Sequence, residues 1–199
     1  MSVIGDVLFY NRNGASVSDH ARYFHGQLRE TVGRLPQSEF DAKSDDEVVD
    51  LVAAEMRMDS LEVDFEKAEK DVQETTVEVR DQFGFRDGPI SVPALRATKS
   101  IPFTGDAGLW TVGTGTWSTS MPQGEVSGNK LVVGMVVRTN QAAEAKTHID
   151  RTIQEIGQYL AQQRVQIDAY NDGLPAQIRP LVEERRKHRG AASALLDQL

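Results

Sequence analysis

The sequence predicts an α+β fold, with N-terminal helices, a mostly antiparallel sheet and then a long C-terminal helix or helical hairpin. Three patterns lead to this prediction. Apolar residues recur at helical spacing between residues 17 and 56, alternate with charged residues between 61 and 79, and recur every seven residues after 142. We expect an α+β sheet domain in residues 1–140. A helical region in residues 141–199 then packs on it, forms an oligomer interface, or does both.

The first residues are expected to be extended and to lead into a helix. Residues 3–10 suit a short strand or extended lead, which the turn-forming residues 11–14 end. A helix over residues 17–35 is indicated by an apolar stripe with spacings of four, four and three, and Pro36 closes it. The stripe consists of Phe24, Leu28, Val32 and Leu35.

A second helix is expected to begin after Ser44. The Ser44 side chain can accept a hydrogen bond from the amide of Glu47, whose carboxylate can reach back to Ser44. This reciprocal arrangement is a capping box, which marks the start of a helix. The apolar stripe that follows consists of Val48, Leu51, Val52 and Met56.

The middle of the chain is expected to form the sheet. Apolar and charged residues alternate in residues 61–66 and again in 74–79, which predicts a half-exposed antiparallel hairpin made of these two segments. Further strands are expected at about 91–98, 108–117 and 129–138. The turns between them are rich in glycine and proline, as in Arg86–Pro89 and Met121–Gly124.

The C-terminal region carries a seven-residue apolar repeat. Pro175 and Pro180 oppose a single straight helix, so two helices joined near residues 171–175 are favoured. Gln163 interrupts a second apolar seam, which otherwise contains Ile149, Ile156 and Tyr170. The repeat itself consists of Ile153, Leu160, Ile167, Leu174, Leu181, His188 and Leu195.

Two accounts of this repeat remain open. In the first it is a self-association surface, on which the buried Gln163 fixes the register of the two chains. In the second, the helical region folds back on itself at residues 171–175 and buries its own stripe. The expected interface residues are Ile153, Ile156, Leu160, Ile167 and Leu181.

Composition describes an acidic chain without cysteine. The formal net charge is −8, and residues 1–150 carry a net −9, because they hold 24 acidic and 15 basic residues. Broad binding of that part to nucleic acid or to anionic membranes would meet like-charge repulsion. The absence of cysteine fits a reducing compartment, and neither a signal-peptide pattern nor a long apolar run is present. We expect a cytoplasmic protein that does not span a membrane.

No motif for catalysis or metal binding meets its structural requirements. Residues 113–118 are not followed by the helix that a dinucleotide loop needs. Residues 41–43 and 144–146 have the spacing of a nuclease motif, but neither segment lies on an expected strand. His20 and His25 are five residues apart and would point in different directions on a helix. We therefore assign no catalytic residue, metal site or cofactor, and an enzyme is the less favoured interpretation.

Aromatic and polar residues gather in the segment 100–117. Such a combination beside a glycine and aspartate turn can form a ligand or partner site, although core aromatics on paired strands are the more common case. The candidate ligand-binding residues are Phe103, Thr104, Asp106, Trp110 and Trp117.

One dense basic cluster occurs near the C-terminus. It could contact phosphate, but Glu183 and Glu184 precede it, and cations near the end of a helix are an ordinary surface feature. Nucleic-acid binding is therefore a hypothesis that we do not favour. Its candidate residues are Arg185, Arg186, Lys187 and Arg189.

The order of these features resembles the N-terminal half of certain bacterial multidomain proteins. The residues that carry the resemblance are the Ile-Pro-Phe-x-Gly-Asp motif at 101–106, Tyr170–Asn171, and the Arg-Arg-Lys cluster at 185–187. In such proteins a catalytic or signalling domain follows, sometimes in antiviral defence. The resemblance implies an attached effector domain and assigns no catalytic residue. The apolar end, Leu195–Leu199, agrees with it, since these leucines either dock or continue into a longer protein.

Three hypotheses for function follow. The leading one is a non-catalytic interaction, oligomerisation or regulatory module of a larger bacterial protein, which associates with itself or with an attached effector domain. The second is a ligand-sensing domain or an enzyme with a pocket near Phe103, Asp106 and Trp110. The third is nucleic-acid binding through the C-terminal basic cluster.

Overall fold

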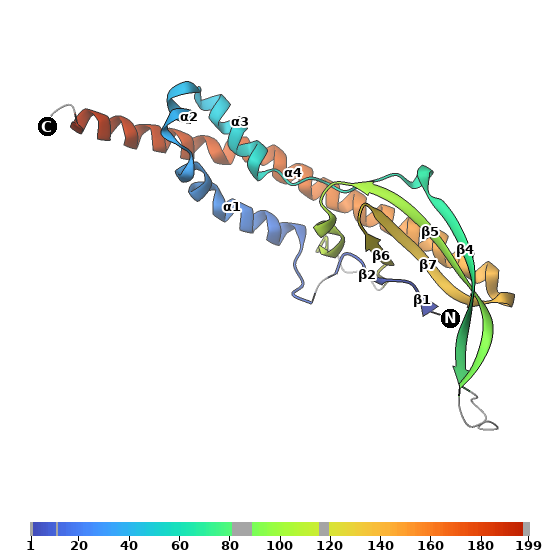
Figure 1. Ribbon diagram of the computed structural model, residues 1–199. Helices are drawn as coiled ribbons and strands as arrows, with labels where there is room; N and C mark the ends of the chain where they lie inside the picture. Colours follow the sequence, from blue (N-terminus) through green and yellow to red (C-terminus); the bar gives the residue numbers. More distant parts are fainter. Residues whose placement is uncertain (1, 11, 81–88, 116–119, 197–199) are drawn as a thin grey trace. The chain divides into compact units, whose positions relative to one another are not determined.

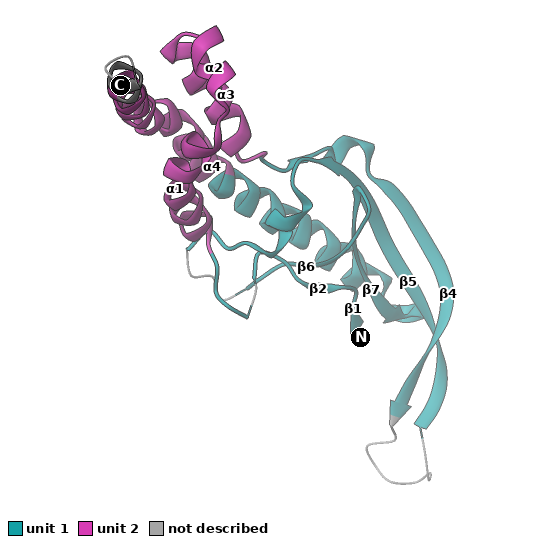
Figure 2. Cartoon of the chain, turned by 60° about the vertical axis from the view of Figure 1, so that its left-hand side comes forward, with its two compact units in different colours: residues 1–15, 60–163 teal, residues 16–59, 164–199 magenta. Residues whose placement is uncertain are grey.

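The computed structural model describes residues 2–10, 12–80, 89–115 and 120–196. The chain forms two compact units (Figure 2). Unit 1 contains residues 1–15 and 60–163, and unit 2 contains residues 16–59 and 164–199. The long helix α4, Ala142–Leu196, contributes its first part to unit 1 and the remainder to unit 2.

Unit 1 is built on an antiparallel sheet of seven strands among the described residues, which confirms the α+β prediction (Figure 1). The order is β2-β6-β7-β5-β3, with β1 paired to β7 and β4 paired to β5. Short 3-10 helices η1 (Phe65–Lys67) and η2 (Ala107–Thr111) lie between strands, and η3 (Thr139–Gln141) leads from β7 into α4. The strands are β1 (Ser2–Val3), β2 (Asp6–Val7), β3 (Glu62–Val63), β4 (Glu69–Arg80), β5 (Pro89–Thr104), β6 (Gln123–Ser127) and β7 (Lys130–Arg138).

The expected hairpin between residues 61–66 and 74–79 is wrong in its pairing. Both β3 and β4 pair with β5, and η1 separates them. The side chain of Asp64 accepts a hydrogen bond from the Lys67 amide at 3.1 Å, so it caps η1 and ends β3 after two residues. Two half-exposed strands in succession had suggested a shared turn, but their common partner is a later strand.

The other strand predictions have mixed outcomes. The strands expected at 91–98 and 129–138 are confirmed as parts of β5 and β7. The strand expected at 108–117 is wrong for residues 108–111, because Asp106 accepts from the Gly108 amide at 2.8 Å and starts η2 there. Residues 116 and 117 of that prediction lie outside the described residues. Strand β6 was not expected, since its first residues lie in a segment with turn composition.

The two faces of β7 differ in burial, and this defines the core of unit 1. One face is fully apolar, and its four side chains are buried. Gly134 lies on the other face, where an added Cβ would be 2.4 Å from the Ala97 carbonyl oxygen, so close strand approach requires glycine there. The buried face consists of Leu131, Val133, Met135 and Val137.

Unit 2 contains the helices α1 (Val17–Arg34), α2 (Gln37–Ala42) and α3 (Asp45–Met56) with the second part of α4. The expected helices over 17–35 and after Ser44 are confirmed, as is the Ser44–Glu47 capping box. Ser16 and Asp19 form a second capping box at the start of α1. The buried side chains of unit 2 include Leu28, Val32, Val48, Val52, Ile167, Leu174, Ile178 and Val182.

The expected break at residues 171–175 is absent, because α4 continues through Pro175 and Pro180. The Asn171 side chain donates to the Met58 carbonyl oxygen and accepts from the Met58 amide, both at 3.0 Å. Leu174 and Ile178 are buried on either side of Pro175. These contacts within unit 2 offset the roughly 3 kcal/mol that a proline costs inside a helix. A helical hairpin that turns at 171–175 is therefore excluded.

Candidate functional site

The sheet of unit 1 has one face covered by α4 and one that α4 leaves open (Figure 1). Ala145 of α4 packs with Met135 and Val137, and Leu95 and Ala97 lie against the same cluster. Side chains alternate along a strand, so the neighbours of these residues belong to the opposite face. We call this the open face. Its residues include Glu69, Asp71, Val77, Val79, Ile90, Val92, Ala94, Arg96, Val136 and Arg138.

Strands β4 and β5 continue together beyond the sheet. β7 ends its pairing at Arg138, opposite Ala94, whereas β4 and β5 remain paired as far as Arg80 and Pro89 (Figure 2). Five residue pairs therefore form a ribbon of two strands, about 17 Å long at the usual rise per residue. We call residues 76–80 and 89–93 the ribbon.

The open face of the ribbon is apolar. Val77 pairs with Val92, and Val79 pairs with Ile90, in direct cross-strand register. All four side chains are half-buried, although no third strand flanks them among the described residues. An isolated ribbon of two strands is marginally stable in water, and the solvated face of an antiparallel sheet is normally polar. The ribbon thus presents the kind of surface that a partner usually covers.

Charges on the open face are separated along the strands. Acidic residues lie at the start of β4. Glu69 forms an ion pair with Lys130 at 2.9 Å, and Asp71 accepts a hydrogen bond from the side-chain amide of Gln73 at 2.8 Å. The arginines lie nearer the ribbon, because Arg96 is level with Gln73 and Arg138 is level with Ala94. Asp71 therefore lies toward one end of the face, where Lys130 offsets the charge of Glu69, the arginines lie in the middle, and the ribbon is the apolar tip.

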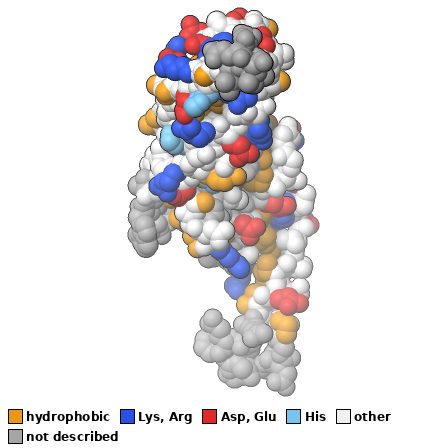
Figure 3. All heavy atoms as spheres, turned by 90° about the vertical axis from the view of Figure 1, so that its left-hand side faces the viewer, with side chains coloured by type: hydrophobic (Ala, Val, Ile, Leu, Met, Phe, Trp, Pro, Cys, Tyr) orange, Lys and Arg blue, Asp and Glu red, His pale blue; other side chains and the backbone are white. Residues whose placement is uncertain are grey.

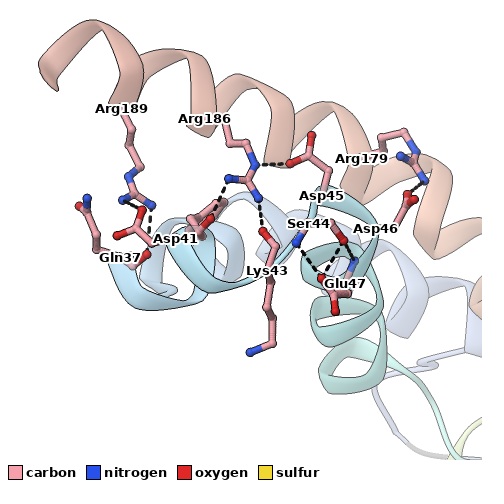
Figure 4. Close-up of polar contacts among 11 residues, drawn as sticks. Gln37, Asp41, Lys43, Ser44, Asp45, Asp46, Glu47, Arg179, Arg186 and Arg189 are labelled. Atoms are coloured by element: carbon pink, nitrogen blue, oxygen red, sulfur yellow. Dashed lines mark hydrogen bonds and ion pairs between the residues drawn. The ribbon is translucent and has the colours of Figure 1, made fainter. Parts of the chain in front are cut away.

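The predicted basic cluster has its partners within unit 2 (Figure 4). Arg186 forms an ion pair with Asp45 and donates to the carbonyl oxygens of Phe40 and Lys43, at 2.8 and 2.6 Å. These carbonyls belong to the last turn of α2 and to its C-cap, where a helix leaves its last acceptors without partners. Arg186 thus joins α4 to the end of α2 and the start of α3.

The neighbouring arginines act in the same way. Arg189 donates to Asp41 at 3.2 Å, and Arg185 donates to the Leu35 carbonyl oxygen at 2.9 Å. The guanidinium carbons of Arg185, Arg186 and Arg189 lie 5.1–5.6 Å from the centre of the Phe40 ring. Lys187 is exposed. In the view of Figure 3, Lys and Arg side chains are intermixed with Asp and Glu.

The predicted aromatic site is divided between core and surface. Phe103 and Trp110 are buried and meet edge to face, with ring centres 5.4 Å apart, while Phe9 stacks on Tyr159 beside them. Thr104 and Asp106 are exposed, and Asp106 caps η2. Trp117 lies outside the described residues.

Gly105 explains the turn between β5 and η2. Gly105 has φ +94°, and an added Cβ would lie 2.1 Å from the Ser60 carbonyl oxygen. Both facts require glycine at this position. The Thr-Gly-Asp sequence therefore has a structural explanation in the turn after β5 and the cap of η2.

The expected interface residues on α4 are largely used within the chain. Ile156 and Ile167 are completely buried, whereas Ile153, Leu160 and Leu181 are half-buried. Gln163, which we expected to set the register between two chains, instead donates to the carbonyl oxygens of Leu109 and Val112 at 3.0 and 2.5 Å. Gln163 is thus used within unit 1.

Residues considered for catalysis have other partners. Asp41 accepts from Arg189, and Glu144 accepts from the Gln141 amide at 3.3 Å. In the part of the chain that the structure describes, no three His, Asp or Glu side chains are grouped as metal ligands. Within the same residues, no helix is both long and apolar enough to cross a membrane.

The open face was only partly evident from the sequence. The alternation at residues 74–79 identified Val77 and Val79 as one side of a strand, but it could not identify β5 as the partner. Comparisons of the chain with protein-family models, with curated proteins and with solved structures found no match to any of the three.

Proposed function

We propose that this chain is a non-catalytic self-association module, in which the open face of the unit 1 sheet binds a second copy of the same face. The observation that carries this proposal is the ribbon, whose four paired Val and Ile side chains continue beyond every other strand of the described sheet. Covering them would remove apolar surface from water, which is the main driving force of protein association.

Charge separation on the face favours a second copy as the occupant. In a two-fold symmetric contact, residue i of one copy meets residue j of the other, and j meets i. When the two faces lie antiparallel with Asp71 of one copy opposite Arg138 of the other, the ribbon of each copy covers the partner's strand row that contains Glu69 and Ser100. Asp71 lies opposite Thr98, and Arg138 lies opposite Ala94. Both side chains are on the open face, so Asp71 of one copy is suited to pair with Arg138 of the other.

Self-association through the sheet also fits the burial on α4. Of the α4 residues that suggested an interface, Ile156 and Ile167 are completely buried inside the units, while Ile153, Leu160 and Leu181 are half-buried. Association through Ile156 or Ile167 would have to expose part of a core, whereas association through the open face requires no rearrangement. A module of this kind could bring together copies of an attached effector domain in a bacterial cytoplasmic protein, including one active in defence.

The test is light scattering across a concentration series, with circular dichroism as the check on folding. We expect the wild-type protein to be a dimer. Val77→Glu should make it monomeric while leaving the strand signal unchanged, because the new charge lies on the open face. Val72→Glu is the matched control, since Val72 is 63% exposed on the other face of the same strand, and this variant should stay dimeric.

A charge exchange tests the arrangement of the two copies. Asp71→Arg and Arg138→Asp should each weaken association by about tenfold, equivalent to about 1.4 kcal/mol, and the double variant should restore it. A wild-type protein that is monomeric at every concentration contradicts the proposal. So does a dimer that Val77→Glu leaves intact, because its interface must lie elsewhere.

A further inference from the structure

A pocket opens on the covered side of the unit 1 sheet, opposite the open face. It lies between β4, β5, the end of β7 and the first turns of α4, and has a volume of about 240 Å³. Its walls include the apolar side chains of Val72, Leu95, Ala97, Val137, Ala145 and Ile149. Sites for drug-sized ligands typically measure ~300–1,000 Å³, while an apolar cavity of about 150 Å³ holds benzene. The size therefore suits a short aliphatic chain.

Basic residues outnumber acidic residues in the pocket lining. Asp150 accepts from Lys99 at 2.9 Å and from Lys146 at 2.5 Å, so one carboxylate is shared by two ammonium groups. Lys70 adds a third ammonium to the lining. The other acidic residue of the lining, Asp71, accepts from the Gln73 side chain. An excess of positive charge thus accompanies the apolar walls.

The start of α4 adds to the positive charge at the pocket. The pocket lining begins at Ala142, the first residue of α4, where the helix dipole is positive. Lys99 is buried enough that three quarters of its side chain is shielded from water, which strengthens its interaction with an anion.

We infer that this pocket binds a small aliphatic carboxylate, with its chain against the apolar walls and its carboxylate at Lys99 and Lys146. The ligand carboxylate competes with Asp150 for two ammonium groups, which together can satisfy both anions. This inference does not rest on the proposed self-association, because Lys99, which holds the ligand carboxylate, lies on the covered face of the sheet.

The experiment is a titration of the wild-type protein, followed by isothermal calorimetry and by methyl NMR signals of Ala97 and Ala145. The probes are octanoate, 1-octanol, octylamine and acetate. We expect octanoate to bind and to shift both methyl signals, and acetate, which lacks the chain, to bind at least tenfold more weakly. Octanol should bind more weakly than octanoate, and octylamine more weakly still.

Variants separate the two parts of the site. Lys99→Met should weaken octanoate about tenfold and leave octanol unchanged. Ala142→Leu should weaken both probes because it narrows the pocket. Ala143→Leu is the control, since Ala143 is also exposed on the same turn but does not line the pocket. The inference is overturned if octanoate produces no heat and no shift at millimolar concentration. It is also overturned if octanol or octylamine binds as tightly as octanoate.

Discussion

The guanidinium of Arg186 lies 5.6 Å from the centre of the Phe40 ring and donates to the carbonyl oxygen of the same residue at 2.8 Å. It also reaches Asp45 and the Lys43 carbonyl oxygen, so one planar group serves three acceptors and a ring. Lysine cannot reproduce this arrangement, because its ammonium is a compact charge without a planar fork. The basic cluster thus stabilises unit 2 through geometry as well as charge.

We predict that Arg186→Lys lowers the free energy of unfolding by about 1–3 kcal/mol, from the loss of charge-assisted hydrogen bonds to partly buried acceptors. Urea denaturation followed by circular dichroism measures the change. Lys187→Ala, at the exposed neighbouring position, should alter stability by no more than about 0.5 kcal/mol. Equal effects of the two substitutions would contradict the assigned role of Arg186.

Gln163 is expected to stabilise the junction between α4 and η2 in unit 1. Gln163→Leu keeps the volume but removes the side-chain donor from the buried carbonyl oxygens of Leu109 and Val112. Among the described residues, only the Leu109 carbonyl oxygen still accepts from a backbone amide, that of Val112 at 3.1 Å. The free energy of unfolding should fall by about 1–3 kcal/mol. Gln158→Leu provides the control, because Gln158 is exposed on the same helix. A Gln163 variant as stable as the control would show that another donor can replace the amide.

Burial on α4 predicts opposite outcomes for two residues close in sequence. Ile167 is 0% exposed in the core of unit 2, so Ile167→Ala should cost about 2–5 kcal/mol through lost contacts and a cavity. Val165 is 70% exposed, and Val165→Ala should change stability by less than about 0.5 kcal/mol. Thermal unfolding of both variants measures the difference. Similar melting temperatures would contradict the register of α4 in unit 2.

Asp150 should make the stability of unit 1 depend on pH in the acidic range. Hydrogen bonds from Lys146 and then Lys99 lower the pKa of its carboxyl group from 3.8 to about 2. A carboxyl group whose pKa is lower in the folded state stabilises the fold above its unfolded pKa, and this contribution disappears as the pH falls through the folded value. The affected window is therefore about pH 4 to pH 2.

NMR titration of the Asp150 side-chain carboxyl group tests this directly. Lys146→Met should raise its pKa more than Lys99→Met does, because Lys146 makes the larger contribution. Asp150→Asn should flatten the loss of stability between pH 4 and pH 2 relative to the wild-type protein. Parallel losses in the two proteins would show that other groups control stability in acid.

The sequence by itself determined the elements whose signals are local. The Ser44–Glu47 capping box joins residues three positions apart, and Pro36 follows directly after α1 and its C-cap. The start of α3 and the end of α1 could therefore be recognised from the sequence alone. The apolar character of β7 was evident for the same reason. Val77 and Val79 were identified as one side of a strand, which is half of the candidate site.

Only the tertiary structure decided which segments meet. Strand β4 selects β5 rather than β3, and α4 continues through Pro175 because Asn171 reaches the Met58 backbone 113 residues away. Arg186 likewise forms an ion pair with Asp45, which is 141 positions away along the chain. Hydrogen bonds and burial at such separations depend on the folded arrangement of the whole unit. Their free energy can exceed the local preferences of turn residues, prolines and charge runs, which are all that sequence patterns report.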